Sequence, residues 1–200
     1  MSLVICVATT NNIIIAGDTQ INNENGPLQD TAMKVFPIGK DTLVGITGDY
    51  KTYIEAANKR TTELDTEHAS FEEKVSFIKN MIYGKNNNAV IAGFDKGKVK
   101  LKVMGHEYGY NDSIIEVNNG AEIKILLPPE ITTEMCRPYI TSLNNLKGQV
   151  INCIKQISRK SNTVNDKVCG LETDGANLEV FTSGIEYKDI DVRIQWFWKK

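Results

Sequence analysis

The sequence predicts an α+β fold in which two β-sheets stack face to face, with a layer of helices outside each sheet. The predicted elements come in the order strands, helices, strands, helices, strands. Grouped runs of this kind favour an α+β fold over alternating βαβ units. Several strands are apolar on both faces, as expected for strands packed between two layers. No internal repeat or low-complexity tract interrupts the chain, so we expect one domain over residues 1–200.

Two hairpins are predicted before the first helix. The β-branched runs "SLVICVA" and "NIIIAGD" are joined by the polar turn "TTNN", and "AMKVFPIG" and "TLVGITGD" are joined by "GKD". Apolar spacing then predicts helices over 50–64 and 69–84. The second of these helices has a capping box, with Ser70 as N-cap and Glu73 three residues later, and Gly84 is a plausible C-terminal stop.

The second half of the chain repeats these patterns. Three further hairpins are predicted around the turns "DKGK", "NNGA" and "TDGAN". Residues 131–160 are predicted to be mostly helical, with Pro138 and Gly148 starting, bending or dividing the helix. The tail "YKDIDVRIQWFWKK" is predicted to form a last strand that docks Trp196 or Trp198.

Composition excludes several classes of function. Apolar residues make up 41% of the 200 residues, and the formal net charge of −2 gives no electrostatic case for nucleic acid or an anionic membrane. No secretory signal pattern is visible and no segment reaches the roughly 18 apolar residues that span a bilayer. The four cysteines form no C-x-x-C pair, so we expect reduced, mostly buried thiols in a cytoplasmic protein that holds no metal.

The chemistry of the chain is predicted to lie at its start. The chain has no G-x-G-x-x-G, no G-x-x-x-x-G-K and no G-x-S-x-G motif. If Met1 is removed, Ser2 carries a free α-amine with a pKa of about 8. That amine can take the proton of the Ser2 hydroxyl, directly or through one water. A core strand that begins at the next residue would hold this terminal nucleophile rigidly.

The stretch "SLVICVATTNNIIIAGDTQ…AMKVFPIGKDTLVGITGDYKTYIEA" resembles the N-terminal part of the proteasome β-type and HslV-like peptidases, which are N-terminal-nucleophile hydrolases. In that family a terminal Thr opens a strand, an Asp after a Gly follows sixteen residues later, and a Lys follows sixteen beyond that. Ser2, Asp18 and Lys34 stand at these intervals here. The likeness is good through residue 65 and then rests on the order of elements.

The resemblance implies a four-layer αββα sandwich and a peptidase that cleaves amide bonds without metal or organic cofactor. Ser2 would attack the carbonyl with its own amine as base, and Asp18 would orient Lys34, whose lowered pKa would suit it to stabilise the alkoxide. The backbone N–H of Gly48, or of Gly45, would stabilise the oxyanion.

The resemblance also implies partners: a peptide or unfolded-protein substrate, a homo-oligomeric ring and an ATP-dependent unfoldase. Two alternatives stay open, a structural or binding subunit without activity and a small-molecule amidase. The chain departs from the family in using Ser in place of Thr. It also lacks the family's Ser-Gly and Asp supports around the nucleophile, and Thr132, Ser161 and Asp166 are the candidate substitutes.

Overall fold

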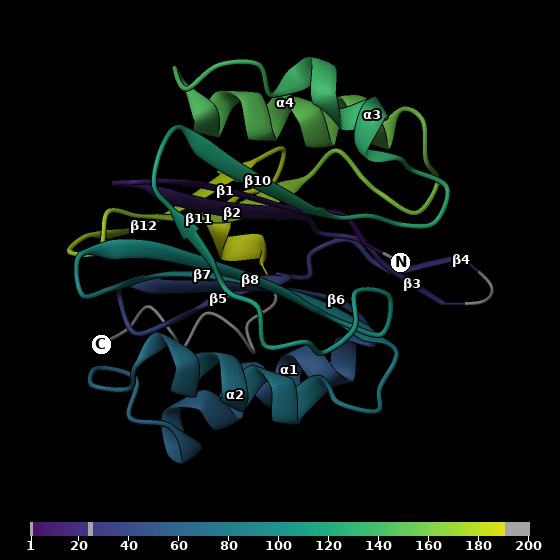
Figure 1. Ribbon diagram of the computed structural model, residues 1–200. Helices are drawn as coiled ribbons and strands as arrows, with labels where there is room; N and C mark the ends of the chain where they lie inside the picture. The colour runs from purple at the N-terminus through teal and green to yellow at the C-terminus, as the bar shows by residue number, and fades with distance from the viewer. Residues whose placement is uncertain (1, 24–25, 191–200) are drawn as a thin grey trace.

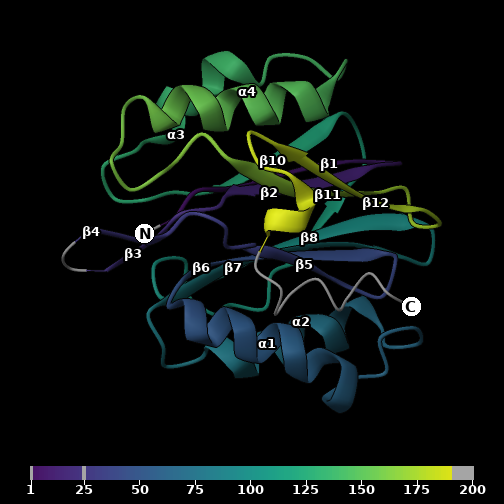
Figure 2. The same ribbon diagram turned by 180° about the vertical axis from the view of Figure 1, so that it is seen from behind.

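The computed structural model describes residues 2–23 and 26–190. Two five-stranded antiparallel sheets lie face to face, and a two-stranded hairpin projects from one end of this stack (Figure 1). Helices cover the outer face of each large sheet, as the view from behind also shows (Figure 2). Among the described residues, no helix is both long enough and apolar enough to cross a membrane.

The first large sheet, called the β1 sheet below, joins both ends of the chain. Its strands are β1 (Val4–Thr9), β2 (Ile13–Asp18), β10 (Ala121–Leu126), β11 (Val168–Thr173) and β12 (Leu178–Ser183). They lie in the order β10-β1-β2-β11-β12, and every neighbouring pair is antiparallel. The start of the chain is therefore a central strand of this sheet.

The second large sheet, called the β6 sheet, is built from the middle of the chain. Its strands, in spatial order, are β5 (Val35–Ile38), β6 (Thr42–Gly48), β7 (Asn87–Asp95), β8 (Lys98–Gly105) and β9 (Ile115–Val117). The projecting hairpin forms a sheet of its own from β3 (Ile21–Asn23) and β4 (Gly26–Gln29).

Four α-helices and two 3-10 turns complete the described chain. They are α1 (Tyr50–Glu63), α2 (Phe71–Ile82), α3 (Thr133–Cys136), α4 (Leu146–Ser158) and the 3-10 turns Arg137–Tyr139 and Tyr187–Asp189. α1 and α2 pack on the β6 sheet, whereas α4 packs on β2 and β11 of the β1 sheet.

The residues of strand β1 are apolar on both faces because both faces are buried. Successive side chains of a strand point to opposite faces. Val4, Cys6 and Ala8 belong to the core between the two large sheets. Ile5 and Val7 belong to the core between the β1 sheet and α4. All six residues of β1 are buried, so this strand is covered on both sides as its pattern predicts.

Most local predictions are confirmed. β1 pairs with β2, β5 with β6, β7 with β8, and β11 with β12, each across its predicted turn. The capping box of α2 is present: the Ser70 hydroxyl accepts the N–H of Glu73 at 3.3 Å, and the Glu73 carboxylate accepts the N–H of Ser70 at 2.7 Å. The four cysteines are buried free thiols, as expected.

The hairpin predicted around "NNGA" is wrong. β9 pairs with β8 in the β6 sheet, while β10 pairs with β1 in the β1 sheet, so the turn carries the chain from one sheet to the other. The turn residues show only that the chain reverses there. Which strand β10 joins is decided by burial: Leu126 enters the core between the large sheets, and the neighbouring Ile125 packs toward α4.

The prediction of a four-layer αββα sandwich of the N-terminal-nucleophile type is also wrong for this chain. The described residues form three antiparallel sheets and four α-helices, a small β-rich fold. The third sheet arises because residues 21–29, expected only as a connection, pair with themselves. Coverage by helices is uneven, since α3 has just four residues and residues 140–145 interrupt the helix predicted over 131–160.

Pro138 falls in the 3-10 turn Arg137–Tyr139, and Gly148 is the third residue of α4, so both lie where that helix is divided or begins. The last strand predicted for the tail, with Trp196 and Trp198, lies outside the described residues.

Candidate active site

The start of β1 and the end of β2 meet at one end of the β1 sheet. In the antiparallel register Val4 lies opposite Gly17. The backbone N–H of Leu3 donates to Asp18 Oδ1 at 2.8 Å, and the N–H of Asp18 donates to the Leu3 carbonyl at 3.2 Å. The first hairpin thereby brings Ser2 beside Asp18, as expected when the two ends of one hairpin lie together.

Lys34 reaches the same place from the other large sheet. It directly precedes β5, and its carbonyl accepts the N–H of Ile46 on β6 at 3.1 Å. Its ammonium Nζ lies 2.7 Å from Asp18 Oδ2, with side-chain exposures of 3% for Lys34 and 0% for Asp18. Two residues sixteen positions apart in sequence thus form a buried ion pair between the sheets.

The Lys34 ammonium is only partly satisfied. Its contact with Asp18 has the distance of an ion pair, but Nζ makes no hydrogen bond of acceptable geometry to any described residue. Burial lowers the pKa of Lys34, and the Asp18 carboxylate opposes that shift. A buried lysine with N–H groups to spare can donate to an oxygen that develops negative charge.

Asp18 is fixed by three partners. Oδ1 accepts the N–H of Leu3, while Oδ2 accepts the N–H of Gln20 at 3.1 Å and pairs with Lys34. A carboxylate held by two backbone donors and a cation has little freedom to rotate. Its orientation therefore determines where the Lys34 ammonium sits.

Ser2, Lys34 and Gly48 line one small pocket of about 20 Å³. That volume holds about one water molecule, whose minimum is roughly 10–15 Å³. The other lining residues are Ile21, Asn22, Ile46, Asp49, Tyr50 and Tyr53. Since a single water can bridge an amine and a hydroxyl, a pocket of this size suits a proton relay at Ser2.

A larger cavity lies elsewhere. About 700 Å³ opens between the turn after β1, the start of α4 and the turn after β11, and no predicted site residue lines it. We place the candidate site at the small pocket, because the buried ion pair lies there.

The two candidate oxyanion glycines differ in position. Gly48 ends β6 with φ of +105°, lines the pocket, and precedes Asp49, the N-cap of α1. Gly45 lies in the middle of β6, paired with Val35 on one side and Val90 on the other. A Cβ at Gly45 would stand 2.5 Å from Val4 Cγ1, so this glycine allows the two sheets to approach. The structure brings Gly48, but not Gly45, to the pocket.

One of the three candidate supports lies near the site. Ser161 is buried, and its hydroxyl donates to Glu130 Oε1 at 2.6 Å and contacts Thr163 Oγ1 at 2.9 Å. Thr163 also donates to Glu130. Partial burial of Glu130 acts to raise its pKa, but these two hydrogen bonds hold it below the ordinary value. By contrast, Thr132 is the exposed N-cap of α3 and Asp166 is exposed.

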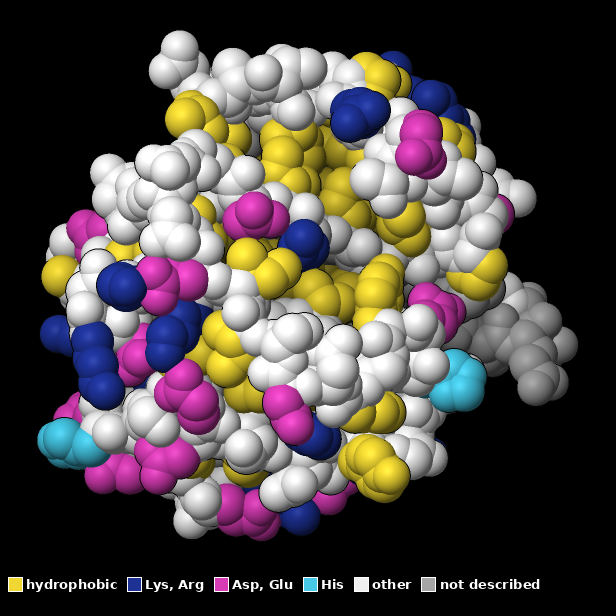
Figure 3. Space-filling view, viewed as in Figure 1, with side chains coloured by type: hydrophobic (Ala, Val, Ile, Leu, Met, Phe, Trp, Pro, Cys, Tyr) yellow, Lys and Arg dark blue, Asp and Glu magenta, His cyan; other side chains and the backbone are white. Residues whose placement is uncertain are grey.

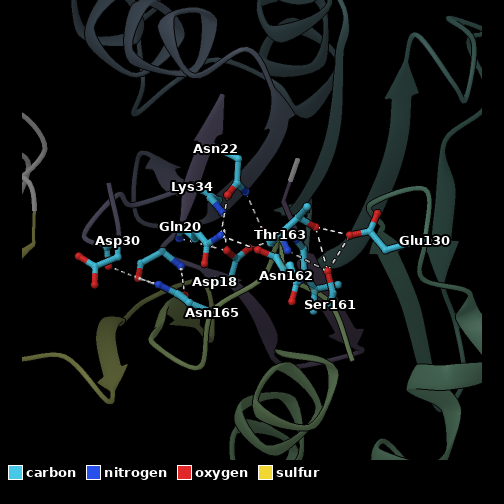
Figure 4. A network of polar contacts seen from close by, with 12 residues as sticks. Asp18, Gln20, Asn22, Asp30, Lys34, Glu130, Ser161, Asn162, Thr163 and Asn165 are labelled. Atoms are coloured by element: carbon cyan, nitrogen blue, oxygen red, sulfur yellow. Dashed lines mark hydrogen bonds and ion pairs between the residues drawn. The ribbon is translucent and has the colours of Figure 1, made fainter. Parts of the chain in front are cut away.

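Figure 4 shows the network that joins this cluster to Asp18. Gln20 Nε2 donates to the Asn162 carbonyl at 2.9 Å and to Asn22 Oδ1 at 2.6 Å, and Asn22 Nδ2 donates to the Thr163 carbonyl at 2.9 Å. Gln20, Asn22, Glu130 and Thr163 were not predicted. Their partners lie as far as 142 residues away in sequence, so no local pattern points to them.

Two further observations concern metal ligands and surface charge. Among the residues described, no group of three or more His, Cys, Asp or Glu side chains could hold a metal ion. The face seen in Figure 3 mixes acidic and basic side chains without a large patch of one sign.

No protein-family model and no curated protein matches the sequence. Among solved structures, the chain is similar to Anbu (ancestral β-subunit) from Yersinia bercovieri, with a TM-score of 0.69 at 13% identity over 97% of this chain and 92% of that one. It is also similar to a Gly-1 mutant of Anbu from Hyphomicrobium sp. strain MC1, with a TM-score of 0.70 at 11% identity over 98% and 93%.

These similarities show that the chain shares the fold of these structures. They correct the expected membership of the proteasome β-type and HslV-like family, because the similar structures are Anbu proteins, a distinct family. The sequence resemblance rested on the spacing of Ser2, Asp18 and Lys34 within the first 65 residues.

Proposed function

We propose that this protein is an amide-bond hydrolase that acts on peptides, with Ser2 as its N-terminal nucleophile once Met1 is removed. The observation that supports this most is the convergence of Ser2, the buried Lys34–Asp18 pair and Gly48 on one pocket. A buried lysine beside a hydroxyl-bearing residue and a backbone donor is an arrangement suited to acyl transfer.

In the proposed mechanism the Ser2 α-amine takes the hydroxyl proton, directly or through one water, and Oγ attacks the substrate carbonyl. The carbonyl oxygen gains the electron pair and is stabilised by the N–H of Gly48. Lys34 stabilises the forming alkoxide, and Asp18 orients Lys34. The C–N bond then breaks, the amine leaves with the proton held by the α-amine, and an ester on Ser2 remains. A water molecule then attacks the ester, and the α-amine takes a proton from it. That proton passes to Oγ as the ester bond breaks and the acid product leaves.

Two measurements test this function. N-terminal sequencing and intact mass of the protein from its native host should show Ser2 first. A β-lactone probe should then add its mass at Ser2. The matched variants are Ser2→Ala, which removes the nucleophile, and Ser2→Thr, which keeps a hydroxyl. Labelling of Ser2→Thr but not of Ser2→Ala is expected. Full retention of Met1 would exclude the mechanism and favour a subunit without activity.

Assembly is a second part of the proposal. The similar structure from Yersinia bercovieri is an ancestral β-subunit, and by analogy we propose that this chain forms a homo-oligomeric ring and works with an ATP-dependent unfoldase. Light scattering tests the ring, and a monomer at all concentrations would contradict it. Stimulation of hydrolysis of a folded substrate by a co-purified ATPase tests the unfoldase.

A further inference from the structure

The N–H of Gly48 must point toward the site of Ser2 if it is to stabilise an oxyanion there. Backbone groups alternate between the two edges of a strand. The N–H of Ile46 leaves β6 on the β5 side, where it meets the Lys34 carbonyl at 3.1 Å. Gly48 stands two residues further along β6, so its N–H leaves by that same edge. Because β5 begins only at Val35, this N–H lies beyond the end of the β5–β6 pairing, on the side of the site.

The peptide that carries this N–H is held from the opposite edge of β6 by one side chain. Asn87 is the first residue of β7 and is buried. Its Nδ2 donates to the Thr47 carbonyl at 3.0 Å. The Thr47 carbonyl and the Gly48 N–H belong to one planar trans peptide and point in opposite directions. Since Asn87 holds the carbonyl toward β7, it holds the N–H toward the site.

The same side chain also holds the residue after Gly48. Nδ2 of Asn87 carries a second hydrogen, and this nitrogen also donates to the Asp49 carbonyl at 3.1 Å. Asp49 is the N-cap of α1, so the Asn87 amide joins the end of β6 to the start of that helix. The β6–β7 pairing ends with Gly48 and Asn87, and Gly48 has a φ of +105°. A glycine at the end of a ladder has wide conformational freedom, and Asn87 restrains it on both sides.

The orientation of the Asn87 amide is fixed, and it has a cost. The Asn87 backbone is anchored on the β8 side, where its carbonyl accepts the N–H of His106 at 2.9 Å. Turning the side-chain amide over would place Oδ1 against the carbonyl oxygens of Thr47 and Asp49, which would repel it. In the orientation present, Oδ1 is buried and has no hydrogen-bond partner among the described residues. A buried acceptor without a partner lowers stability, so stability alone does not account for an asparagine here.

We propose that Asn87 is a positioning residue for the reaction at Ser2. It does not line the pocket and acts through the peptide that it holds, by keeping the Gly48 N–H directed at the oxygen that gains negative charge. A donor that is fixed in advance stabilises a transition state better than one that must first rotate into place. This inference depends on the proposed function, because it concerns the oxyanion donor of that same site.

The test compares Asn87→Leu with the wild type, because leucine has nearly the shape of asparagine but donates no hydrogen bond. The measurements are kcat and KM for one peptide amide, and the affinity for a boronic acid of the same peptide, which forms a tetrahedral adduct with a hydroxyl nucleophile. We expect kcat to fall at least about tenfold while KM changes by less than about threefold. The boronic acid should lose affinity by the same factor as kcat/KM, because its adduct resembles the transition state.

The matched control is Asn88→Leu. Asn88 is the next residue of β7 and is also buried, but its Oδ1 accepts the N–H of Glu107 at 3.0 Å. The control thus removes a buried hydrogen bond of the same strand, and its kcat should equal that of the wild type. Each kcat is expressed per Ser2 that a β-lactone labels, so a loss of folded protein does not imitate the effect. If Asn87→Leu does not fold, Asn87→Ala replaces it, with Asn88→Ala as control, and should lower kcat in the same way.

The outcomes separate the two proposals. An unchanged kcat in Asn87→Leu, or a fall that Asn88→Leu reproduces, overturns the role of Asn87 and leaves Ser2 as nucleophile. A higher KM with an unchanged kcat overturns it as well, because that pattern marks a loss of substrate binding. Absence of both hydrolysis and a β-lactone adduct on Ser2 in the wild type overturns the proposed function itself, and the inference about Asn87 with it.

Discussion

The backbone N–H of Leu3 donates to the buried carboxylate of Asp18 across 2.8 Å, although the two residues are fifteen positions apart. The second oxygen of the same carboxylate meets the Lys34 ammonium at 2.7 Å. One buried carboxylate thus fixes both the residue after Ser2 and the lysine beside it. The geometry of the candidate site and the stability of the fold depend on the same ion pair.

Asp18→Asn should destabilise the protein strongly. The substitution keeps an acceptor for Leu3 but leaves Lys34 as a buried cation without a counter-ion. Breaking a buried pair in this way costs about 3–5 kcal/mol. Urea unfolding measures the loss. The double variant Asp18→Asn with Lys34→Met removes the stranded charge and should recover part of it. A loss below about 1 kcal/mol for Asp18→Asn would show that the pair is not buried in solution.

Gly48→Ala should cost more than Gly84→Ala. Both glycines have positive φ, +105° and +71°, so both substitutions carry backbone strain. A Cβ at Gly48 would also stand 2.1 Å from the Asn86 carbonyl oxygen, whereas nothing lies within 4 Å of one at Gly84. We expect an additional loss of about 1–3 kcal/mol for Gly48→Ala and slower labelling of Ser2, since the backbone must shift. Equal losses for the two variants would contradict the close approach.

Gln20→Met should make the position of the Asp18 carboxylate less restrained. Methionine keeps the length of the side chain but loses the bonds from Gln20 to the Asn162 carbonyl and Asn22. The segment that carries the N–H donor to Asp18 Oδ2 is then less restrained, so the Leu3 amide, which donates to Oδ1, should exchange its hydrogen faster. Amide exchange followed by NMR measures this. Gln149→Met is the control, because Gln149 also ties a loop through its amide, at Ser142 and Asn144, but faces solvent. Leu3 protection that stays at the wild-type level in Gln20→Met would rule out the link.

Stability should rise with pH on account of Lys34. Burial lowers the pKa of Lys34 from its ordinary value of 10.5. Between the lowered value and 10.5 the unfolded chain binds a proton that the folded chain has released, so the free energy of unfolding increases with pH in that window. The wild type should therefore gain stability relative to Lys34→Met as pH approaches 10.5 and then level off. Urea unfolding at several alkaline pH values tests this, and a gap that narrows with rising pH would contradict the lowered pKa.

The local predictions were confirmed where a sequence pattern and the contacts that it predicts involve the same few neighbouring residues. The "TTNN" turn and the capping box of Ser70 and Glu73 each depend on contacts within one turn or one hairpin. The "NNGA" turn shows the limit of this approach. It does reverse the chain, but the strands on either side join different sheets.

The structure brings together some, but not all, of the candidate site residues. The resemblance pointed to Ser2, Asp18 and Lys34, and the fold does bring these three residues together. Of the three candidate supports, only Ser161 belongs to the cluster beside the site, and its partners Glu130 and Thr163 were missed. A side-chain hydrogen bond between segments more than thirty residues apart does not alter the periodicity of apolar residues in either segment, so the sequence pattern does not reveal it.

By itself, the sequence determined the strands of the two large sheets, the helices α1 and α2, and the hairpin that carries Ser2 and Asp18. These follow from side-chain periodicity and turn chemistry, which act over a few residues. Only the tertiary structure decided that β10 lies beside β1, that residues 21–29 form a third sheet, and that Gly48 rather than Gly45 faces the pocket. Those choices depend on which distant surfaces bury each other, and many distant pairings satisfy the same local pattern.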